Sequence, residues 1–102
     1  MIHVIATIEL VDGKRDAFLK EFHQLIPRVH AEDGCYEYGS AVEIPTSIAA
    51  QTTPRDNVVI VVEKWASLAA LEAHLKATHM TDYRAKVKDF VKKVSLQVLQ
   101  QA

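Results

Sequence analysis

The chain has 102 residues, of which 49% are hydrophobic and 25% are charged, and its formal net charge at pH 7 is −1. This length predicts a single domain spanning residues 1–102, and the composition is typical of a soluble globular protein. The near-neutral charge leaves no basic surface of the kind that binds nucleic acid, so we expect no nucleic-acid partner.

The cysteine count and the apolar runs bear on the cellular compartment. Cys35 is the single cysteine, which excludes an internal disulfide and favours a reducing environment. Glu9 and Asp12 interrupt the N-terminal apolar pattern early, so we expect no signal peptide. The longest apolar run, Val58–Val62, is too short to span a bilayer, so we expect no membrane insertion. The sequence therefore predicts a cytoplasmic protein.

The first elements are a strand and a helix. Apolar residues alternate over Ile2–Val11, which predicts a strand. Asp12-Gly13 breaks this pattern, and Asp12 is a plausible N-cap for a helix from Lys14 to about His30. Pro27 falls inside that helix and removes a backbone hydrogen bond, so it predicts a kink or a break near the last turn.

The middle of the chain predicts two further strands. Glu32-Asp33-Gly34 indicates a turn, and Cys35–Ile44 a second strand. Pro45–Asp56 is polar and contains two prolines, so it predicts a loop with a short turn near its centre. The continuous apolar run in Asn57–Trp65 predicts a third strand that is buried on both faces. In the second strand, the residues expected on one face are Tyr36, Tyr38, Val42 and Ile44.

The last third of the chain predicts helical segments followed by a strand. Ser67 can cap a helix from Leu68 to about Lys76. A second helical segment is expected from Thr81 or Asp82 to Val91. Alternation of Val94, Leu96 and Val98 with polar residues predicts a fourth strand.

The resulting order, β-α-β-β-α-β, predicts an α+β protein with the ferredoxin-like arrangement. In this arrangement a four-stranded antiparallel sheet carries both helices on one face. The uncovered face would present Ile5, Val11 and members of the set Val59, Val61 and Trp65, or their neighbours of opposite parity. So large an apolar area is uncommon on a monomer, so we expect a homodimer whose sheets pack face to face.

The most informative stretch begins at the end of the third strand. Glu63 and Trp65 are two residues apart on a strand, so their side chains share one face. The helix that follows offers His74, and His79 comes just after it. A carboxylate, a large aromatic ring and imidazoles this close together indicate a small-molecule pocket.

Several landmarks then occur in an ordered series along nearly the whole chain: Val4-Ile5-Ala6, Gly13-Lys14, Phe18, Glu32-Asp33-Gly34-Cys35, Tyr38, Glu63-Lys64-Trp65, Ala70-Leu71, His74 and His79. With these landmarks the chain resembles the antibiotic biosynthesis monooxygenase (ABM) family of the dimeric α/β-barrel superfamily, in its quinol monooxygenase branch. The resemblance implies a homodimer whose sheets form a barrel, with one pocket per subunit between sheet and helices. It also implies oxidation of a quinol or polycyclic phenol by molecular oxygen without a cofactor.

A cofactor-independent oxygenase needs a base, an apolar pocket and groups that hold the developing anion. We expect His74 to be the base, because an imidazole transfers protons near neutral pH. Glu63 would orient it, Trp65 and Tyr38 would line the pocket, and His79 would be a second substrate-binding group. Each residue also has a structural alternative: a packed helix histidine for His74, a cross-sheet ion pair for Glu63, a helix cap for His79, and core packing for Trp65 and Tyr38.

Metal and cysteine chemistry have less support in the sequence. His23 and His30 lie on one side of the first predicted helix and, with His3 or Glu32, could suggest a metal site. Their separation of seven residues is not the spacing of about four that helical metal ligands favour, so we expect no metal site there. The resemblance likewise implies no other cofactor. Cys35 would need His30 or His3 as a neighbouring base to act in catalysis, and otherwise it is a small buried hydrophobe.

Two departures from other branches of the superfamily shape the functional prediction. Haem-degrading relatives carry an Asn in the first strand and a late helical His, whereas this chain has Ala6-Thr7 and Arg84 in those regions. We therefore do not expect haem degradation. The resemblance favours a cofactor-independent monooxygenase acting on a quinol or polycyclic phenol. The alternatives are a non-oxidative isomerase of a small carbonyl metabolite, and a non-catalytic ligand-binding or stress module on the same fold.

Overall fold

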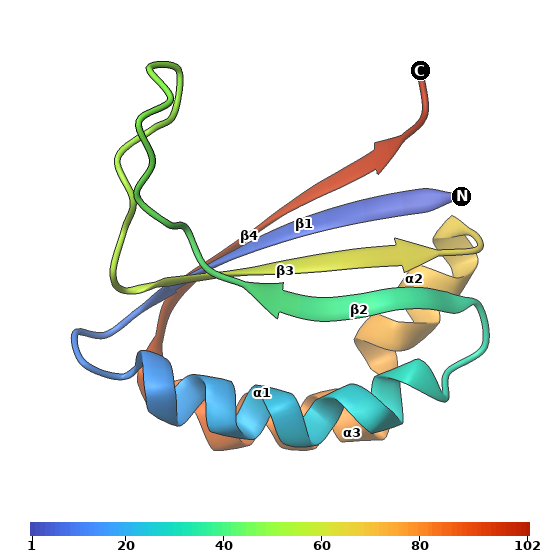
Figure 1. The fold of residues 1–102 in the computed structure, drawn as a ribbon. Coiled ribbons are helices and arrows are strands. Elements are labelled where there is room, and N and C mark those ends of the chain that lie inside the picture. Colours follow the sequence, from blue (N-terminus) through green and yellow to red (C-terminus); the bar gives the residue numbers. More distant parts are fainter.

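The computed structural model describes all 102 residues and contains one four-stranded antiparallel sheet, with strand order β2-β3-β1-β4 (Figure 1). This is the predicted ferredoxin-like arrangement, in which β1 lies in the middle and pairs with both β3 and β4. The predicted loop Pro45–Asp56 contains no helix or strand and extends away from the helices (Figure 1). The strands are β1 (Ile2–Leu10), β2 (Cys35–Ala41), β3 (Val58–Trp65) and β4 (Val91–Gln100).

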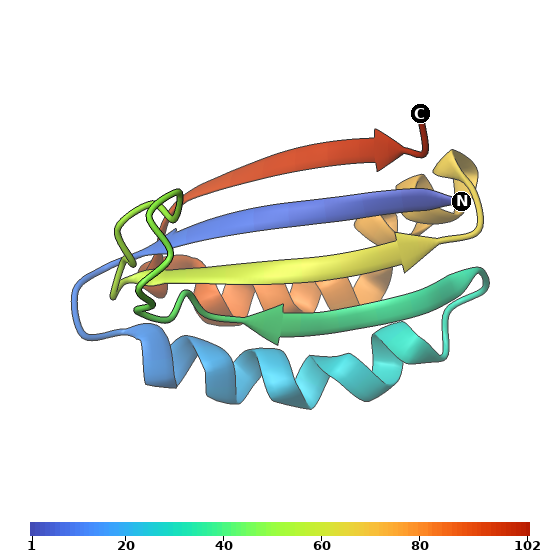
Figure 2. The same ribbon diagram turned by 45° about the horizontal axis from the view of Figure 1, so that its top comes forward.

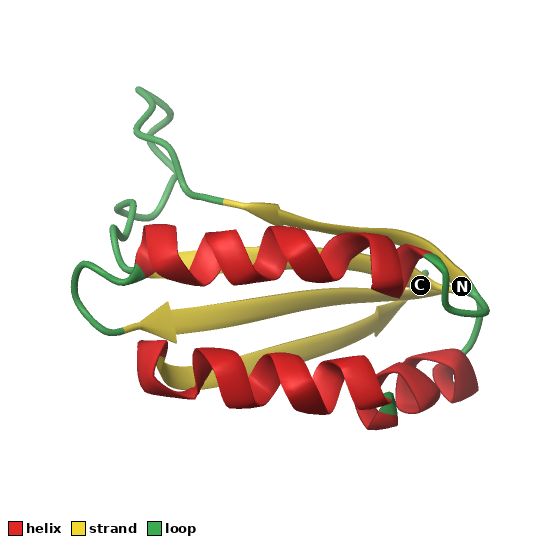
Figure 3. Cartoon of the chain, turned by 90° about the horizontal axis from the view of Figure 1, so that it is seen from below, coloured by secondary structure: helices red, strands yellow, loops and turns green.

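All the helices lie on one face of the sheet (Figure 2). Seen from below, α1 runs along one side of that face and α2 with α3 along the other (Figure 3). The hydroxyl of Ser67 caps α2 as predicted. The second helical segment begins earlier than the predicted Thr81 or Asp82, because extended backbone at Ala77 ends α2 and α3 starts directly after it. The helices are α1 (Arg15–His30), α2 (Leu68–Lys76), α3 (Thr78–Val87) and the short 3₁₀ helix η1 (Lys88–Phe90).

One local prediction for α1 is wrong. The N-cap is Lys14, and the Asp12 carboxylate instead accepts a 2.8 Å hydrogen bond from the Asn57 amide. Of the two alternatives for Pro27, the helix does not break there but continues to His30, and a kink at Pro27 stays a prediction. Since Asn57 directly precedes β3, the Asp12 side chain ties the turn before α1 to the sheet.

Strand β2 is shorter and more irregular than predicted, since it ends before Ile44. Its register against β3 shifts between Cys35 and Glu37, which makes Tyr36 the extra residue of a β-bulge. The bulge reverses the alternation of the strand, so Tyr36 is exposed whereas Tyr38 is buried. The prediction that Tyr36 and Tyr38 share one face is therefore wrong.

The core lies between the sheet and the helices. The residues Val59, Val61 and Trp65, one of the sets suggested for the uncovered face, are buried on the helix-covered face instead. Their place is fixed by pairing of β3 with β1, whose even-numbered residues point to the helices. The neighbours of opposite parity, Ile60 and Val62, join Ile5 on the other face, where all three are half-buried. No helix in the structure has both the length and the apolar character needed to cross a membrane.

Candidate functional site

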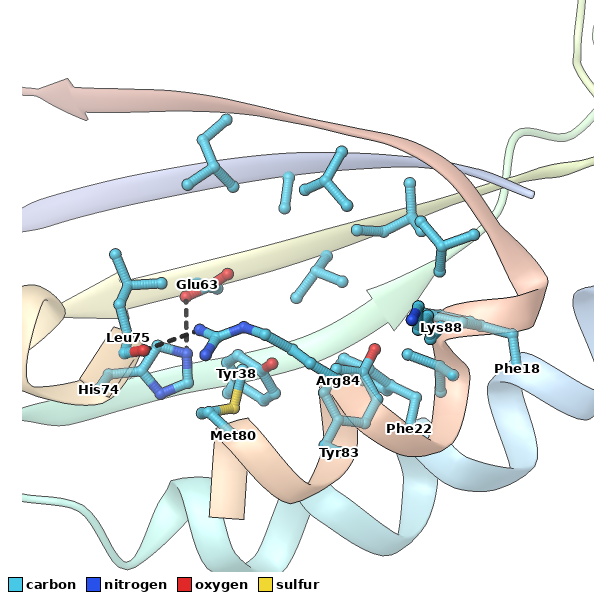
Figure 4. A pocket seen from close by; sticks show the side chains of 17 residues that line it. Phe18, Phe22, Tyr38, Glu63, His74, Leu75, Met80, Tyr83, Arg84 and Lys88 are labelled. Carbon is cyan, nitrogen blue, oxygen red and sulfur yellow. Dashed lines mark hydrogen bonds and ion pairs between the residues drawn. The ribbon is translucent and has the colours of Figure 1, made fainter. Parts of the chain in front are cut away.

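A cavity of about 460 Å³ lies between the sheet and α3 (Figure 4). Its walls are mainly apolar and come from the helix-facing side of the sheet, from α1 and from α3. This volume is in the range of small-molecule binding sites. Four lining residues carry ionisable groups outside the tyrosines, namely Glu63, His74, Arg84 and Lys88.

His74 reaches the cavity from α2 and is 1% exposed. Its Nδ1 lies 2.8 Å from Oε2 of Glu32, at the turn before β2. A carboxylate can only accept a hydrogen bond, so this contact assigns the proton to Nδ1 and leaves the lone pair on Nε2. Nε2 lies on the side of Glu63, which also lines the cavity. Glu32 thus holds the Nδ1 side of the imidazole, and the basic Nε2 faces the end of the cavity.

The surroundings of His74 keep its ring neutral. Burial lowers the pKa of His74, and the hydrogen bond and charge of Glu32 oppose this effect only in part. The nearby charges of His79 and Arg84 lower the pKa of His74 further. A buried imidazole that is neutral at pH 7 can accept a proton from a bound ligand.

Glu63 is buried and bonded to its strand neighbour. The indole N–H of Trp65 donates a 2.9 Å hydrogen bond to Oε1 of Glu63. Burial raises the pKa of Glu63 to about 7, although the Trp65 hydrogen bond acts in the opposite direction. The same oxygen lies 4.0 Å from Nε2 of His74, which is too long for a hydrogen bond. The contact that orients His74, which we predicted for Glu63, is made by Glu32.

The two aromatic residues predicted to line the pocket occupy different places. Tyr38 lines the cavity, and its ring lies 5.4 Å from that of His74 and 5.3 Å from that of Phe22. Burial raises the pKa of Tyr38, so its hydroxyl remains protonated. Trp65 is fully buried with its ring 4.6 Å from that of His74, and it is not part of the cavity wall. Trp65 therefore packs against His74 and is hydrogen-bonded to Glu63 without contacting the cavity itself.

His79 lies outside this cavity. It belongs to α3 and borders a second, polar groove next to α1. Its Nε2 lies 2.8 Å from Oε2 of Glu32, the oxygen that also contacts His74. The two predicted histidines are therefore linked through one carboxylate, with His74 at the cavity and His79 at the groove.

Glu32, His74 and His79 are the residues that could hold a metal ion. Their donor atoms all lie within 4.8 Å of one another, and two imidazoles with a carboxylate suit divalent transition metals. His3, His23 and His30, the histidines considered as metal ligands from the sequence, are not part of this cluster. His23 contacts the Ser40 hydroxyl at 3.4 Å, and His30 contacts a backbone carbonyl of β2 at 3.1 Å.

Glu32 is the site residue that sequence reasoning missed. It belongs to the turn that ends at Gly34, where φ is +80°. A Cβ at Gly34 would lie 2.9 Å from Cβ of Ala70, so glycine lets the turn approach α2 closely. This approach brings Glu32 to His74 across 42 positions of the sequence. The turn was visible in the sequence, but its neighbour depends on the pairing of β2 with β3.

Comparisons with known proteins concern the family and the fold of the chain. The family model described as "Antibiotic biosynthesis monooxygenase" matches residues 1–86. The "Probable quinol monooxygenase YgiN" of Escherichia coli strain K12 is 36% identical over 102 residues, which cover 98% of this chain and 97% of that protein. Among solved structures, Rv0793 from Mycobacterium tuberculosis has a TM-score of 0.79 at 25% identity. The match covers 99% of this chain and 94% of that chain. PA3566 from Pseudomonas aeruginosa has a TM-score of 0.80 at 24% identity, with coverages of 99% and 93%, and this likeness shows the fold.

Proposed function

The chain belongs to the antibiotic biosynthesis monooxygenase family, and from this premise we propose that it is a cofactor-independent monooxygenase that oxidises a quinol or polycyclic phenol with molecular oxygen. The observation that carries the proposal is the buried imidazole of His74 at one end of an apolar cavity of about 460 Å³. Such a cavity accommodates a fused aromatic ring system, and a neutral base at its end can ionise the ring hydroxyl.

In the proposed reaction, Nε2 of His74 accepts the proton of the bound hydroxyl. Glu32 holds the Nδ1–H and stabilises the imidazolium that forms, because its carboxylate lies 2.8 Å away. The ionised ring is electron-rich and donates electrons to oxygen. For a quinol, one oxygen atom enters the ring and the other leaves as water with two hydrogens of the quinol, so the product is a hydroxyquinone.

The remaining site residues bind and position. Tyr38, Phe22 and the apolar residues of the sheet would contact the rings of the substrate. Trp65 would keep His74 and Glu63 in place through ring packing and its hydrogen bond. Packing that fixes a catalytic side chain in one rotamer preserves the distance between base and substrate.

Oxygen uptake by metal-stripped protein with a panel of reduced naphthoquinols tests the proposal, after autoxidation is subtracted. We expect His74→Gln to lower turnover by about 100-fold or more, since it removes the general base. His23→Ala is the matched control, because His23 is an exposed histidine outside the cavity. Circular dichroism of each variant establishes that it is folded.

Three outcomes would contradict the proposal. Full turnover by folded His74→Gln would remove His74 from the role of base. Substrate conversion without oxygen would favour a non-oxidative isomerase of a small carbonyl metabolite. Tight quinol binding with no product in air would favour a non-catalytic ligand-binding module.

The homodimer remains part of this proposal. Half-buried Ile5, Ile60 and Val62 on the face opposite the helices would be covered if two sheets packed together. Sedimentation equilibrium tests this expectation, and a monomer at micromolar concentration would contradict it. The cytoplasmic location likewise stays a prediction, which fractionation of cells tests.

A further inference from the structure

Arg84 lies in the wall of the cavity, and the proposed reaction gives this cation no role. Its side chain extends from α3 across the cavity toward the end occupied by His74 (Figure 4). One of its nitrogens, Nη2, donates a 2.8 Å hydrogen bond to the backbone carbonyl of Leu75. A guanidinium carries five N–H donors, so this anchor leaves donors for a ligand.

Arg84 has no acidic partner in the protein. The ion pairs of the chain join Arg55 to Glu43 and Lys64 to Glu37, and the histidine contacts involve Glu32 and Glu63. The guanidinium is thus fixed through a neutral carbonyl, and its charge is not compensated by a carboxylate. Its charge acts on the catalytic end of the cavity, since it contributes to lowering the pKa of His74.

The remaining charges of the wall favour an anion as well. Lys88 lines the end of the cavity that lies away from His74 and also has no acidic partner (Figure 4). Glu63 is the one carboxyl group in the wall. A cavity wall with two cations and one carboxyl group favours a negatively charged ligand.

We infer that the cavity binds its ligand as an anion, with an apolar ring system in the cavity and one negatively charged oxygen paired with Arg84 beside His74. The inference rests on the proposed function for the choice of cavity, and it adds the charge of the ligand and the residue that recognises it. The negative oxygen has two sources of the same chemistry: a ring hydroxyl that has lost its proton, and a carboxylate substituent. Arginine suits both, because its planar fork forms paired charge-assisted hydrogen bonds with oxyanions.

Equilibrium binding of two matched probes tests the inference without requiring turnover. The probes are 2-naphthoate, which is an anion, and 2-naphthamide, its neutral counterpart, both measured by titration calorimetry at low salt. We expect the protein to bind 2-naphthoate at least about tenfold more tightly, as charge-assisted hydrogen bonds predict. Arg84→Gln should abolish this preference, and Arg84→Lys should retain part of it.

Two matched controls separate the role of Arg84 from the general effect of charge. Lys86→Gln removes the same charge from the same helix, but Lys86 borders the polar groove and not the cavity. Lys88→Gln removes the cation at the far end of the cavity. Lys86→Gln should keep the preference for 2-naphthoate within about threefold, because it leaves the charges of the cavity wall unchanged. Lys88→Gln should lower the preference less than Arg84→Gln does, because the pair formed beside His74 remains. Thermal unfolding checks that each variant is folded.

A third probe distinguishes the two sources of the anion. Absorbance titration of bound 2-naphthol reports the pKa of its hydroxyl. If the anion is an ionised ring oxygen, the protein should lower that pKa, and Arg84→Gln should reverse the change. A preference for 2-naphthoate with no effect on 2-naphthol would identify the carboxylate source.

Several results would overturn the inference. These are equal binding of the naphthoate and the amide, a preference that survives Arg84→Gln, a preference lost equally in Lys86→Gln, and no binding of either probe. The proposed function fails separately. Absence of oxygen uptake with quinols, together with an Arg84-dependent preference, would reject the oxygenase and leave the anion site in place.

Discussion

The two halves of the helix-covered sheet face differ sharply in packing. Where α1 and α2 cover the sheet, Trp65 and Glu63 of β3 are buried together with Phe22 of α1 and His74 of α2. On β4 the corresponding apolar side chains are far less covered, since Val94 is 53% exposed and Leu96 is 46% exposed. The four sheet residues among these, Glu63, Trp65, Val94 and Leu96, share the helix-facing side, because each lies opposite an even-numbered residue of β1.

The difference shows that the packed half of the face holds side chains rigidly, whereas the open half offers a surface for binding. The packed half fixes the orientation of the imidazole through contacts with Trp65 and Glu32. The open half supplies an apolar wall, formed in part by Val94 and Leu96, that a ligand can cover. An apolar surface that a protein leaves uncovered commonly marks an interaction site.

The largest expected effect lies in the packed half. Replacing Trp65 with Ala should lower the free energy of unfolding by about 3–5 kcal/mol, because it leaves a cavity and removes the hydrogen bond to Glu63. Urea unfolding followed by far-ultraviolet circular dichroism measures this loss. A cost below about 1 kcal/mol would mean that the two halves do not differ in packing as described.

Glu63 should make the stability of the packed half depend on pH. The native state raises the pKa of Glu63 from 4.5 to about 7, so the stabilisation from its protonated form is complete below pH 4.5 and is lost as the pH rises through 7. The difference between these pKa values corresponds to about 3 kcal/mol lost by pH 8. Urea titrations at pH 4 and pH 8 measure it. Glu63→Gln should flatten this pH dependence, and an unchanged slope in that variant would assign the effect to another group.

The contact that positions His74 should affect activity more than stability. Glu32→Gln removes the carboxylate that raises the pKa of His74, so the acidic limb of the pH–rate profile should move to lower pH. The value of kcat should fall by about tenfold, because the imidazolium loses its ionic partner. Steady-state kinetics from pH 5 to pH 9 provide both readouts. A fall in kcat with no change in the acidic limb would show that Glu32 acts on structure alone.

The smallest effect on stability is expected in the open half. Leu96→Ala should change the free energy of unfolding by less than about 1 kcal/mol, because the side chain is already half exposed. It should raise KM for the quinol a few-fold, since it removes part of the cavity wall. Stability measurement and kinetics on the same preparation test this separation. A large loss of stability without a change in KM would reverse the comparison.

The fold could be predicted where the side chains themselves indicate the local backbone conformation. The alternation in β1 marked that strand correctly, and the hydroxyl of Ser67 marked the start of α2. The start of α3 carried no such signal, because its N-cap Ala77 has no side-chain hydrogen-bonding group. The prediction therefore placed the start at Thr81 or Asp82, just before the apolar stripe that begins at Tyr83.

The site could be predicted only in part, because its geometry depends on pairing between distant segments. His74 and Glu63 were found from their order along the chain, and both line the cavity. Glu32 was missed because its contact with His74 follows from the approach of the turn to α2. Tyr36 was misplaced because a bulge depends on the register with the partner strand, which local alternation does not reveal.

The central position of β1 also determines the order in which the chain can fold. Ile2 lies opposite Gln100 on β4 and opposite Trp65 on β3, so each pairing closes a long loop, and the one with β4 is longer. Because the entropy lost on closing a loop grows with its length, pairing with β3 has the lower entropic barrier. During synthesis, moreover, the β1 edge that receives β4 stays unpaired until the last strand has left the ribosome. A nascent chain therefore carries His74 before it has the wall that would hold a substrate beside it.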